Sequence, residues 1–132
     1  MISIPITAFY ASILGIFLVF LSILVIAQRR SAKVSLGDGG DRHMLQMTRA
    51  HANFTEYVPL ILVLLMIAEI NQVNPLFLHV IGWALVISRF LHAYGLRHHF
   101  GPSWQRGAGI LLTFACLLVL SGVNLWPLFF KS

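Results

Sequence analysis

The stretch from Ile2 to Ile26 reads ISIPITAFYASILGIFLVFLSILVI and contains no charged residue. At roughly 1.5 Å per residue, a helix of this length crosses the hydrocarbon core of a bilayer. A signal peptide has a basic start, a shorter apolar region and a small-residue cleavage site. Because this stretch has an uncharged start and a long apolar run, we expect a retained transmembrane helix that begins at about Pro5.

The composition of the chain agrees with a membrane location. Of its 132 residues, 58% are hydrophobic and 10% are charged. A soluble domain is about a quarter charged, and a soluble core of this length could not bury so much apolar sequence. The length allows one domain, residues 1–132. The single cysteine, Cys116, excludes an internal disulfide framework.

Three more apolar stretches complete the expected fold, an all-α integral membrane bundle of four transmembrane helices. The second stretch is fully apolar only from Val58 to Ala68, so it reaches bilayer length only by including polar residues back to Arg49 and beyond. In the fourth, Trp104 and Trp126 are expected to anchor the two interfaces. The predicted helices cover about residues 5–28, 42–70, 75–97 and 104–130.

The basic residues predict the orientation. They gather in the first and third connections, whereas the connection at residues 71–75 has no lysine or arginine. The positive-inside rule therefore places the first and third loops in the cytoplasm and both termini in the periplasm, with Lys131 as a minor exception. This distribution also accounts for the net charge of +5 without a nucleic-acid partner. Asp41 is expected to cap the second helix.

A polar stripe runs along the first half of the second predicted helix. Its members follow one another at steps of four, three, four and three residues, so they share one helix face: Arg42, Gln46, Arg49, Asn53 and Glu56. An unpaired carboxylate inside a membrane is costly. We therefore expect Glu56 to face the interior of the bundle and to be paired.

Further basic residues are expected at the same depth. Arg89 and His92 lie one turn apart on the third helix, Arg106 opens the fourth, and Arg29 and Arg30 close the first. Arginines outnumber carboxylates, which favours a cavity that binds an anion. The alternative is a purely structural ion pair between Glu56 and either Arg89 or Arg49, with the other arginines reaching the interface.

The remaining polar residues favour structural roles. His51 lies nearly opposite Arg49 on the helix, which favours packing or a subunit contact. Glu69, near the outer end, is expected to be solvated. His79 and His92 differ in depth and face, which argues against a haem pair. No metal site is expected, because no cysteine or carboxylate lies near the adjacent histidines 98 and 99.

Residues 48–59, with the sequence TRAHANFTEYVP, closely resemble the second-helix signature of the MAPEG family, the membrane-associated proteins in eicosanoid and glutathione metabolism. The core of that signature is Arg-Ala-x-x-Asn-x-x-Glu followed by a proline. The resemblance extends to Arg29-Arg30, to Arg89 and to Arg106, and it covers essentially the whole chain. The short glycine-rich first loop is similar to that of small bacterial members.

The resemblance implies a homotrimer of left-handed four-helix bundles in a bacterial inner membrane, with glutathione bound at each subunit interface toward the cytoplasm. Glutathione carries two carboxylates and a thiol with a pKa of about 8.5 that reacts as the thiolate. An arginine guanidinium can bind a carboxylate through two hydrogen bonds and can stabilise a thiolate by its charge. By position, Arg106 resembles the arginine that stabilises the thiolate. The residues that resemble the glutathione-binding set are Arg30 (or Arg29), Arg49, Asn53, Glu56, Arg89 and His92.

Two positions depart from the family pattern. Ala52 stands where prostaglandin E-forming members carry an arginine, and Leu96 stands where many family enzymes carry a tyrosine. Tyr94 is near that position but points about half a turn away, unless the helix bends.

Three functions follow as hypotheses. The leading one is a glutathione transferase or peroxidase that uses glutathione as co-substrate and acts on lipophilic electrophiles from the membrane lipid. The second is a non-catalytic family member that binds lipids or a partner, which Leu96 favours. The third, a small multidrug transporter, requires a carboxylate in the first helix, and Ile2–Ile26 has none.

Overall fold

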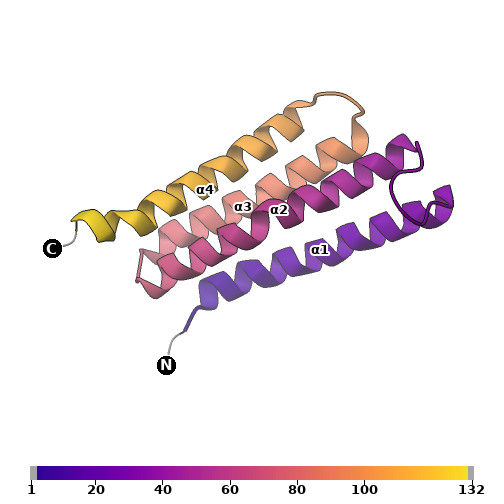
Figure 1. Cartoon of the computed structure of the whole chain (residues 1–132). Coiled ribbons are helices and arrows are strands. Elements are labelled where there is room, and N and C mark those ends of the chain that lie inside the picture. Colours follow the sequence, from indigo (N-terminus) through magenta and orange to yellow (C-terminus); the bar gives the residue numbers. More distant parts are fainter. Residues whose placement is uncertain (1–2, 131–132) are drawn as a thin grey trace.

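The computed structural model describes residues 3–130 and forms an all-α, four-helix membrane bundle. Each helix is long and apolar enough to cross a membrane: α1 (Pro5–Ala32), α2 (Arg42–Ile70), α3 (Pro75–His98) and α4 (Trp104–Phe130). The helices run side by side and alternate in direction (Figure 1). The α1–α2 and α3–α4 loops lie at one end, called here the basic end, and the two termini lie at the other. Ile2 and Lys131 lie outside the described residues.

Local sequence signals define the helix ends. Pro5 opens α1, and the Asp41 side chain accepts a hydrogen bond from the backbone N–H of Met44 at 2.8 Å, so the predicted cap of α2 is confirmed. The α1 helix continues to Ala32, beyond the predicted end near residue 28, and Lys33 ends it in the left-handed conformation at φ 55°. Arg29 and Arg30 therefore lie inside the last turn of α1.

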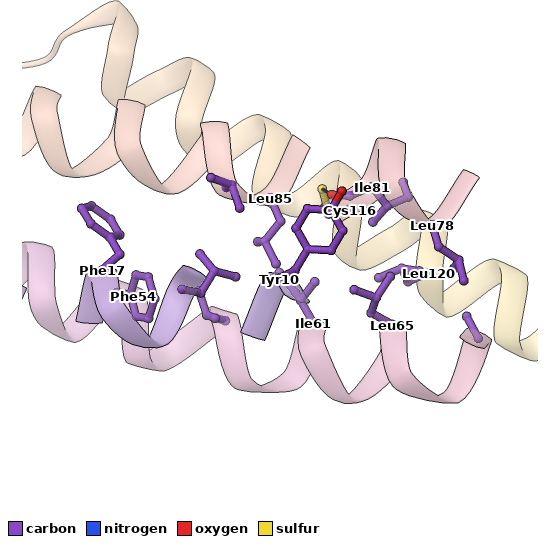
Figure 2. Close-up of a cluster of buried hydrophobic side chains, with 14 of the residues drawn as sticks. Tyr10, Phe17, Phe54, Ile61, Leu65, Leu78, Ile81, Leu85, Cys116 and Leu120 are labelled. Atoms are coloured by element: carbon purple, nitrogen blue, oxygen red, sulfur yellow. Dashed lines mark hydrogen bonds between the residues drawn. The ribbon is translucent and has the colours of Figure 1, made fainter. Parts of the chain in front are cut away.

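Buried apolar side chains from all four helices form the core (Figure 2). The ring of Tyr10 of α1 lies against Gly82 of α3, where a Cβ atom would overlap the tyrosine ring. The Tyr10 hydroxyl donates to the backbone carbonyl of His79 at 3.1 Å and lies 2.9 Å from the imidazole Nδ1 of the same residue. The α1 and α3 helices are therefore in close contact in the half of the bundle remote from the basic end.

The prediction that Glu69 is solvated is wrong. Its carboxylate is not solvated but half-buried, and it accepts hydrogen bonds from the backbone N–H groups of Ile6, at 2.8 Å, and Thr7, at 2.7 Å. The residue that precedes α1, Ile4, has no side-chain acceptor with which to cap that helix. The unpaired N–H groups and the positive end of the helix dipole attract the carboxylate from α2 instead.

Candidate functional site

An open pocket lies near the basic end between α2, α3, α4 and the α3–α4 loop. Its volume is about 570 Å³, which is within the range of roughly 300–1,000 Å³ that small-molecule sites occupy. Of the predicted site residues, Asn53, His92 and Arg106 line it. Tyr57 and Ser103 line it as well.

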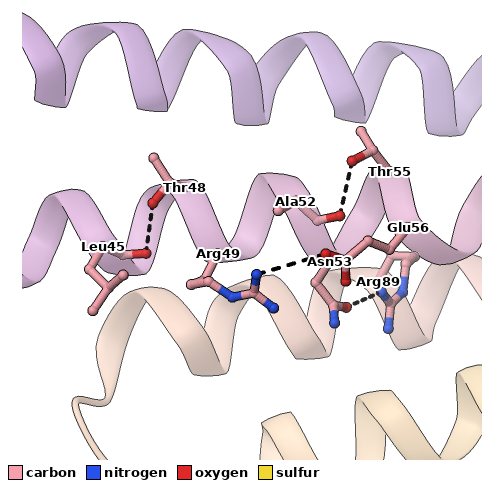
Figure 3. A network of polar contacts seen from close by, with 8 residues as sticks. All are labelled: Leu45, Thr48, Arg49, Ala52, Asn53, Thr55, Glu56 and Arg89. Atoms are coloured by element: carbon pink, nitrogen blue, oxygen red, sulfur yellow. Dashed lines mark hydrogen bonds and ion pairs between the residues drawn. The ribbon is translucent and has the colours of Figure 1, made fainter. Parts of the chain in front are cut away.

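Arg89 lies behind this pocket and is the largest fully buried side chain, with 2% of its surface exposed. Its guanidinium donates to the side-chain oxygen of Asn53 at 2.7 Å (Figure 3) and to the hydroxyl of Thr113 at 2.5 Å. Its Nε has no partner. Within residues 3–130, no carboxylate forms an ion pair with Arg89. The positive charge is therefore buried with neutral partners only, an arrangement that favours a nearby anion.

Glu56 pairs with Arg49 of the same helix, at 3.7 Å, rather than with Arg89 (Figure 3). The prediction that Glu56 is paired is confirmed, but the prediction that it faces the bundle interior is wrong for the single chain. The two side chains are 54% and 49% exposed. They lie on the outward edge of the polar stripe, whereas Gln46 is buried and Asn53 partly buried. Because both partners belong to α2, the pair does not join two helices.

Arg106 lies in the first turn of α4, and the preceding loop positions its guanidinium. It donates to the carbonyl of Gly101 at 3.0 Å, and the Arg106 backbone N–H donates to the Ser103 hydroxyl at 3.3 Å. The imidazole Nδ1 of His92 lies 3.3 Å from the carbonyl of Arg106, which accepts a hydrogen bond in the tautomer that carries its proton on Nδ1. These contacts hold the start of α4 against α3 at the pocket.

Two glycines permit the close approach of α3 and α4 at this site. A Cβ atom at Gly95 would lie 2.7 Å from the Cγ of Arg106, and one at Gly109 would lie 2.8 Å from the Cβ of His92. Both distances are shorter than side-chain atoms tolerate. The α3–α4 contact therefore depends on the absence of side chains at these two positions.

Gln46 connects α2 to the α3–α4 loop. Its side chain is buried and donates from Nε2 to the backbone carbonyl of His99 at 3.1 Å, across 53 positions of sequence. Its side-chain oxygen has no partner. Because His99 begins the loop that carries Gly101 and Ser103, the two residues that contact Arg106 of α4, Gln46 anchors the segment that orients the Arg106 guanidinium.

The structure does not bring Arg30 to the pocket, contrary to the expected convergence of the arginines within one chain. Arg30 is exposed at the end of α1, and none of the described residues of α1 lines the pocket. Arg29 instead donates to the carbonyls of Val34 and Gly37, at 3.5 Å and 2.9 Å. The α1 helix packs on α2 and α3, away from α4, which explains the separation.

The remaining sequence predictions have clear outcomes. Leu96 is buried and Tyr94 is exposed on another face of α3, as expected from their spacing. The His51 imidazole lies 3.0 Å from the Ser22 hydroxyl of α1, so its predicted packing role is confirmed.

Among the pocket residues that sequence reasoning missed, two have polar side chains. Tyr57 follows Asn53 by four residues and so continues the polar face of α2, a signal that could have found it. Ser103 precedes the first residue of α4 and caps it, as serines before helices commonly do. Gln46 belongs to the predicted polar stripe of α2, but its spacing does not indicate the contact with His99.

Comparisons with known proteins agree with this architecture. The chain matches the model of the MAPEG family over residues 7–126. It is 33% identical over 121 residues to the inner membrane protein YecN of Escherichia coli K12, an alignment that covers 92% of this chain and 91% of YecN. YecN of Escherichia coli O6:H1 strain CFT073 gives the same identity and coverage.

Proposed function

The chain belongs to the MAPEG family, and from this premise we propose that it binds glutathione in the pocket between α2, α3 and α4 and transfers the thiol to lipophilic electrophiles. The buried guanidinium of Arg89, which has only neutral partners, carries the proposal. A site with an uncompensated cation favours a ligand with negative charge, and glutathione has two carboxylates.

The proposed chemistry requires only that the thiol be ionised. The Arg106 guanidinium, at the pocket lining, would stabilise the thiolate of the bound glutathione by charge and hydrogen bonding. With a chlorinated aromatic, the thiolate sulfur attacks the electrophilic carbon, forms the carbon–sulfur bond and displaces chloride. With a hydroperoxide, the sulfur attacks the terminal oxygen and breaks the O–O bond, which gives an alcohol and a sulfenic acid, and a second glutathione converts the sulfenic acid to the disulfide and water. No separate general base is needed if the thiol pKa falls toward neutrality. The electrophile arrives from the surrounding lipid.

A homotrimer accounts for the exposed polar surface. The Arg49–Glu56 pair lies near the middle of α2 and is half-exposed on the single chain. Charged side chains that contact lipid at that depth are costly. We infer that a neighbouring subunit covers this face and that Arg30 of the neighbour reaches the ligand there. The arrangement places glutathione at the interface between subunits.

The relatives support a bacterial inner membrane location, because YecN is named an inner membrane protein. The basic residues at the two loops favour placing the basic end, and so the glutathione pocket, on the cytoplasmic side. Both termini then lie in the periplasm.

An activity assay tests the proposal. The purified protein in detergent is given glutathione with a chlorinated aromatic or a lipid hydroperoxide, and turnover is compared among the wild type, Arg106→Ala and the control Lys33→Gln. Lys33 is a basic, exposed residue at the same end of the bundle and is not in the pocket. We expect Arg106→Ala alone to lose most activity. Equal turnover in all three proteins contradicts the role of Arg106.

A second function, a non-catalytic member that binds glutathione or a lipid, is favoured by Leu96. This side chain is buried and apolar where many family enzymes carry a tyrosine. Thermal stabilisation by glutathione without turnover of either substrate distinguishes this function from catalysis.

A further inference from the structure

A second recess lies between α1 and α3 and shares no lining residue with the glutathione pocket. Its volume is about 220 Å³. Leu21 and Leu24 of α1 form one wall, Ala93 of α3 forms the other, and Met47 and Ala50 of α2 form the floor. We call it the α1–α3 groove.

The side chains of these helices explain why the groove exists. At its inner end the rings of Phe17 and Phe90 stack at 4.2 Å between centroids and join α1 to α3. Toward the basic end, the small side chains of Ala50 and Ala93 leave the space between the two helices unfilled. The groove therefore begins at an aromatic contact and continues toward the basic end of the bundle.

The outer end of the groove is cationic and aromatic. Tyr94, Arg97 and His98 line it there, in the last turns of α3. The rings of Tyr94 and His98 lie 4.3 Å apart. Within residues 3–130, no carboxylate forms an ion pair with Arg97, so its charge is available to an anion.

The side chains that line the groove indicate which kind of molecule binds there. The walls are apolar and give water no polar partners, so hydrocarbon fills the space in a bilayer. The mouth combines a free guanidinium with aromatic side chains that favour the membrane interface.

We propose that the α1–α3 groove binds an anionic phospholipid, with one acyl chain between Leu21, Leu24 and Ala93 and the phosphate at Arg97. The attraction of one basic side chain for anionic lipid near a membrane surface corresponds to about a fivefold preference. This site is separate from the glutathione pocket and does not depend on the proposed function.

Native mass spectrometry of the purified protein tests the proposal. Phosphatidylglycerol and phosphatidylcholine with matched acyl chains are added at equal concentration, and the ratio of the two bound lipids is measured for the wild type, Arg97→Gln and Lys33→Gln. We expect the wild type to retain phosphatidylglycerol preferentially. Arg97→Gln should lower that preference about fivefold, whereas Lys33→Gln, an equal change of charge at the same end, should leave it unchanged.

A second variant tests the groove itself. Ala93→Phe fills the space between α1 and α3, and it should reduce retention of both lipids relative to the wild type. Because this variant could also disturb folding, its unfolding temperature is measured in detergent without lipid. If Ala93→Phe folds and retains lipid as the wild type does, the groove is not the binding site.

Three other results overturn the proposal. The first is equal retention of the two lipids by the wild type. The second is an equal loss of preference in Lys33→Gln and Arg97→Gln, which would indicate diffuse surface charge. The third is displacement of phosphatidylglycerol by sodium oleate or by inorganic phosphate at equal concentration, which would identify a free fatty acid or a simple anion as the ligand.

Discussion

Arg89 of α3 donates a hydrogen bond to the side-chain oxygen of Asn53 of α2 at 2.7 Å, and this contact joins the buried cation to the wall of the open pocket. Asn53 is therefore both a pocket residue and a neutral partner of the charge. Because the partner is neutral, the positive potential of Arg89 is not cancelled before it reaches the pocket. If the pocket binds glutathione as proposed, a change at Asn53 should affect both ligand binding and stability.

A negative charge at residue 53 should raise the stability of the protein and lower its affinity for glutathione. Asn53→Asp supplies Arg89 with a carboxylate, so the unfolding temperature should rise while the affinity for glutathione falls. Asn53→Ala removes the acceptor and should lower the free energy of unfolding by about 1–3 kcal/mol. Thermal unfolding with and without glutathione measures both effects. An Asn53→Asp protein that binds glutathione as tightly as the wild type would show that the uncancelled charge is unimportant.

The contact between Glu69 and the start of α1 should contribute to stability. Glu69→Gln keeps the size of the side chain but removes its charge and one acceptor, which leaves a backbone N–H of Ile6 or Thr7 without its partner. We expect the free energy of unfolding to fall by about 1–3 kcal/mol. Denaturant unfolding in detergent micelles measures it. Glu56→Gln, a change at the half-exposed carboxylate of the same helix, should have a smaller effect.

The packing of Tyr10 on Gly82 should be sensitive to a single methyl group. A Cβ atom at residue 82 overlaps the tyrosine ring, so Gly82→Ala should destabilise the protein by about 1–3 kcal/mol. When Tyr10→Leu is also present, Gly82→Ala should lower the free energy of unfolding by a smaller amount. A double-mutant cycle measures this coupling. Gly15→Ala is the matched control, because nothing lies within 4 Å of a Cβ atom there. Additive effects of the two changes would show that the ring does not limit residue 82.

The substitution Gln46→Leu should make the α3–α4 loop more mobile. The change removes the hydrogen bond to the carbonyl of His99, so residues 99–106 should exchange their amide hydrogens faster. Hydrogen–deuterium exchange measured by mass spectrometry detects this. Thr48→Val is the control, because the Thr48 hydroxyl bonds only to carbonyls of its own helix. Unchanged exchange at residues 99–106 in Gln46→Leu would contradict the anchoring role.

The sequence predicted the fold well because its signals are local. Uncharged stretches of bilayer length, Pro5 and Asp41 indicate transmembrane helices and their ends without knowledge of any neighbour. Glu69 was misjudged because its partners, the backbone N–H groups of Ile6 and Thr7, leave no trace in side-chain composition.

The sequence predicted only part of the pocket lining, because Asn53, His92 and Arg106 line the pocket whereas Arg30, Arg49 and Glu56 do not. Helical periodicity brought Asn53 and Arg89 into one region, but it could not decide that Glu56 turns outward to Arg49. The stripe lies at the boundary between the buried and exposed faces of α2, so a small rotation of the helix determines which residues point inward. Packing against α1, α3 and α4 sets that rotation, and it depends on contacts between residues far apart in the sequence, such as Arg89 with Asn53.

Glutathione binding to the purified protein, measured by isothermal titration calorimetry, tests the central claim most directly. We expect saturable binding by the wild type, weaker binding by Arg106→Ala, and unchanged binding by the exposed control Lys33→Gln. No heat of binding by the folded wild type at millimolar glutathione, or equal binding by all three proteins, would contradict a glutathione site at Arg106.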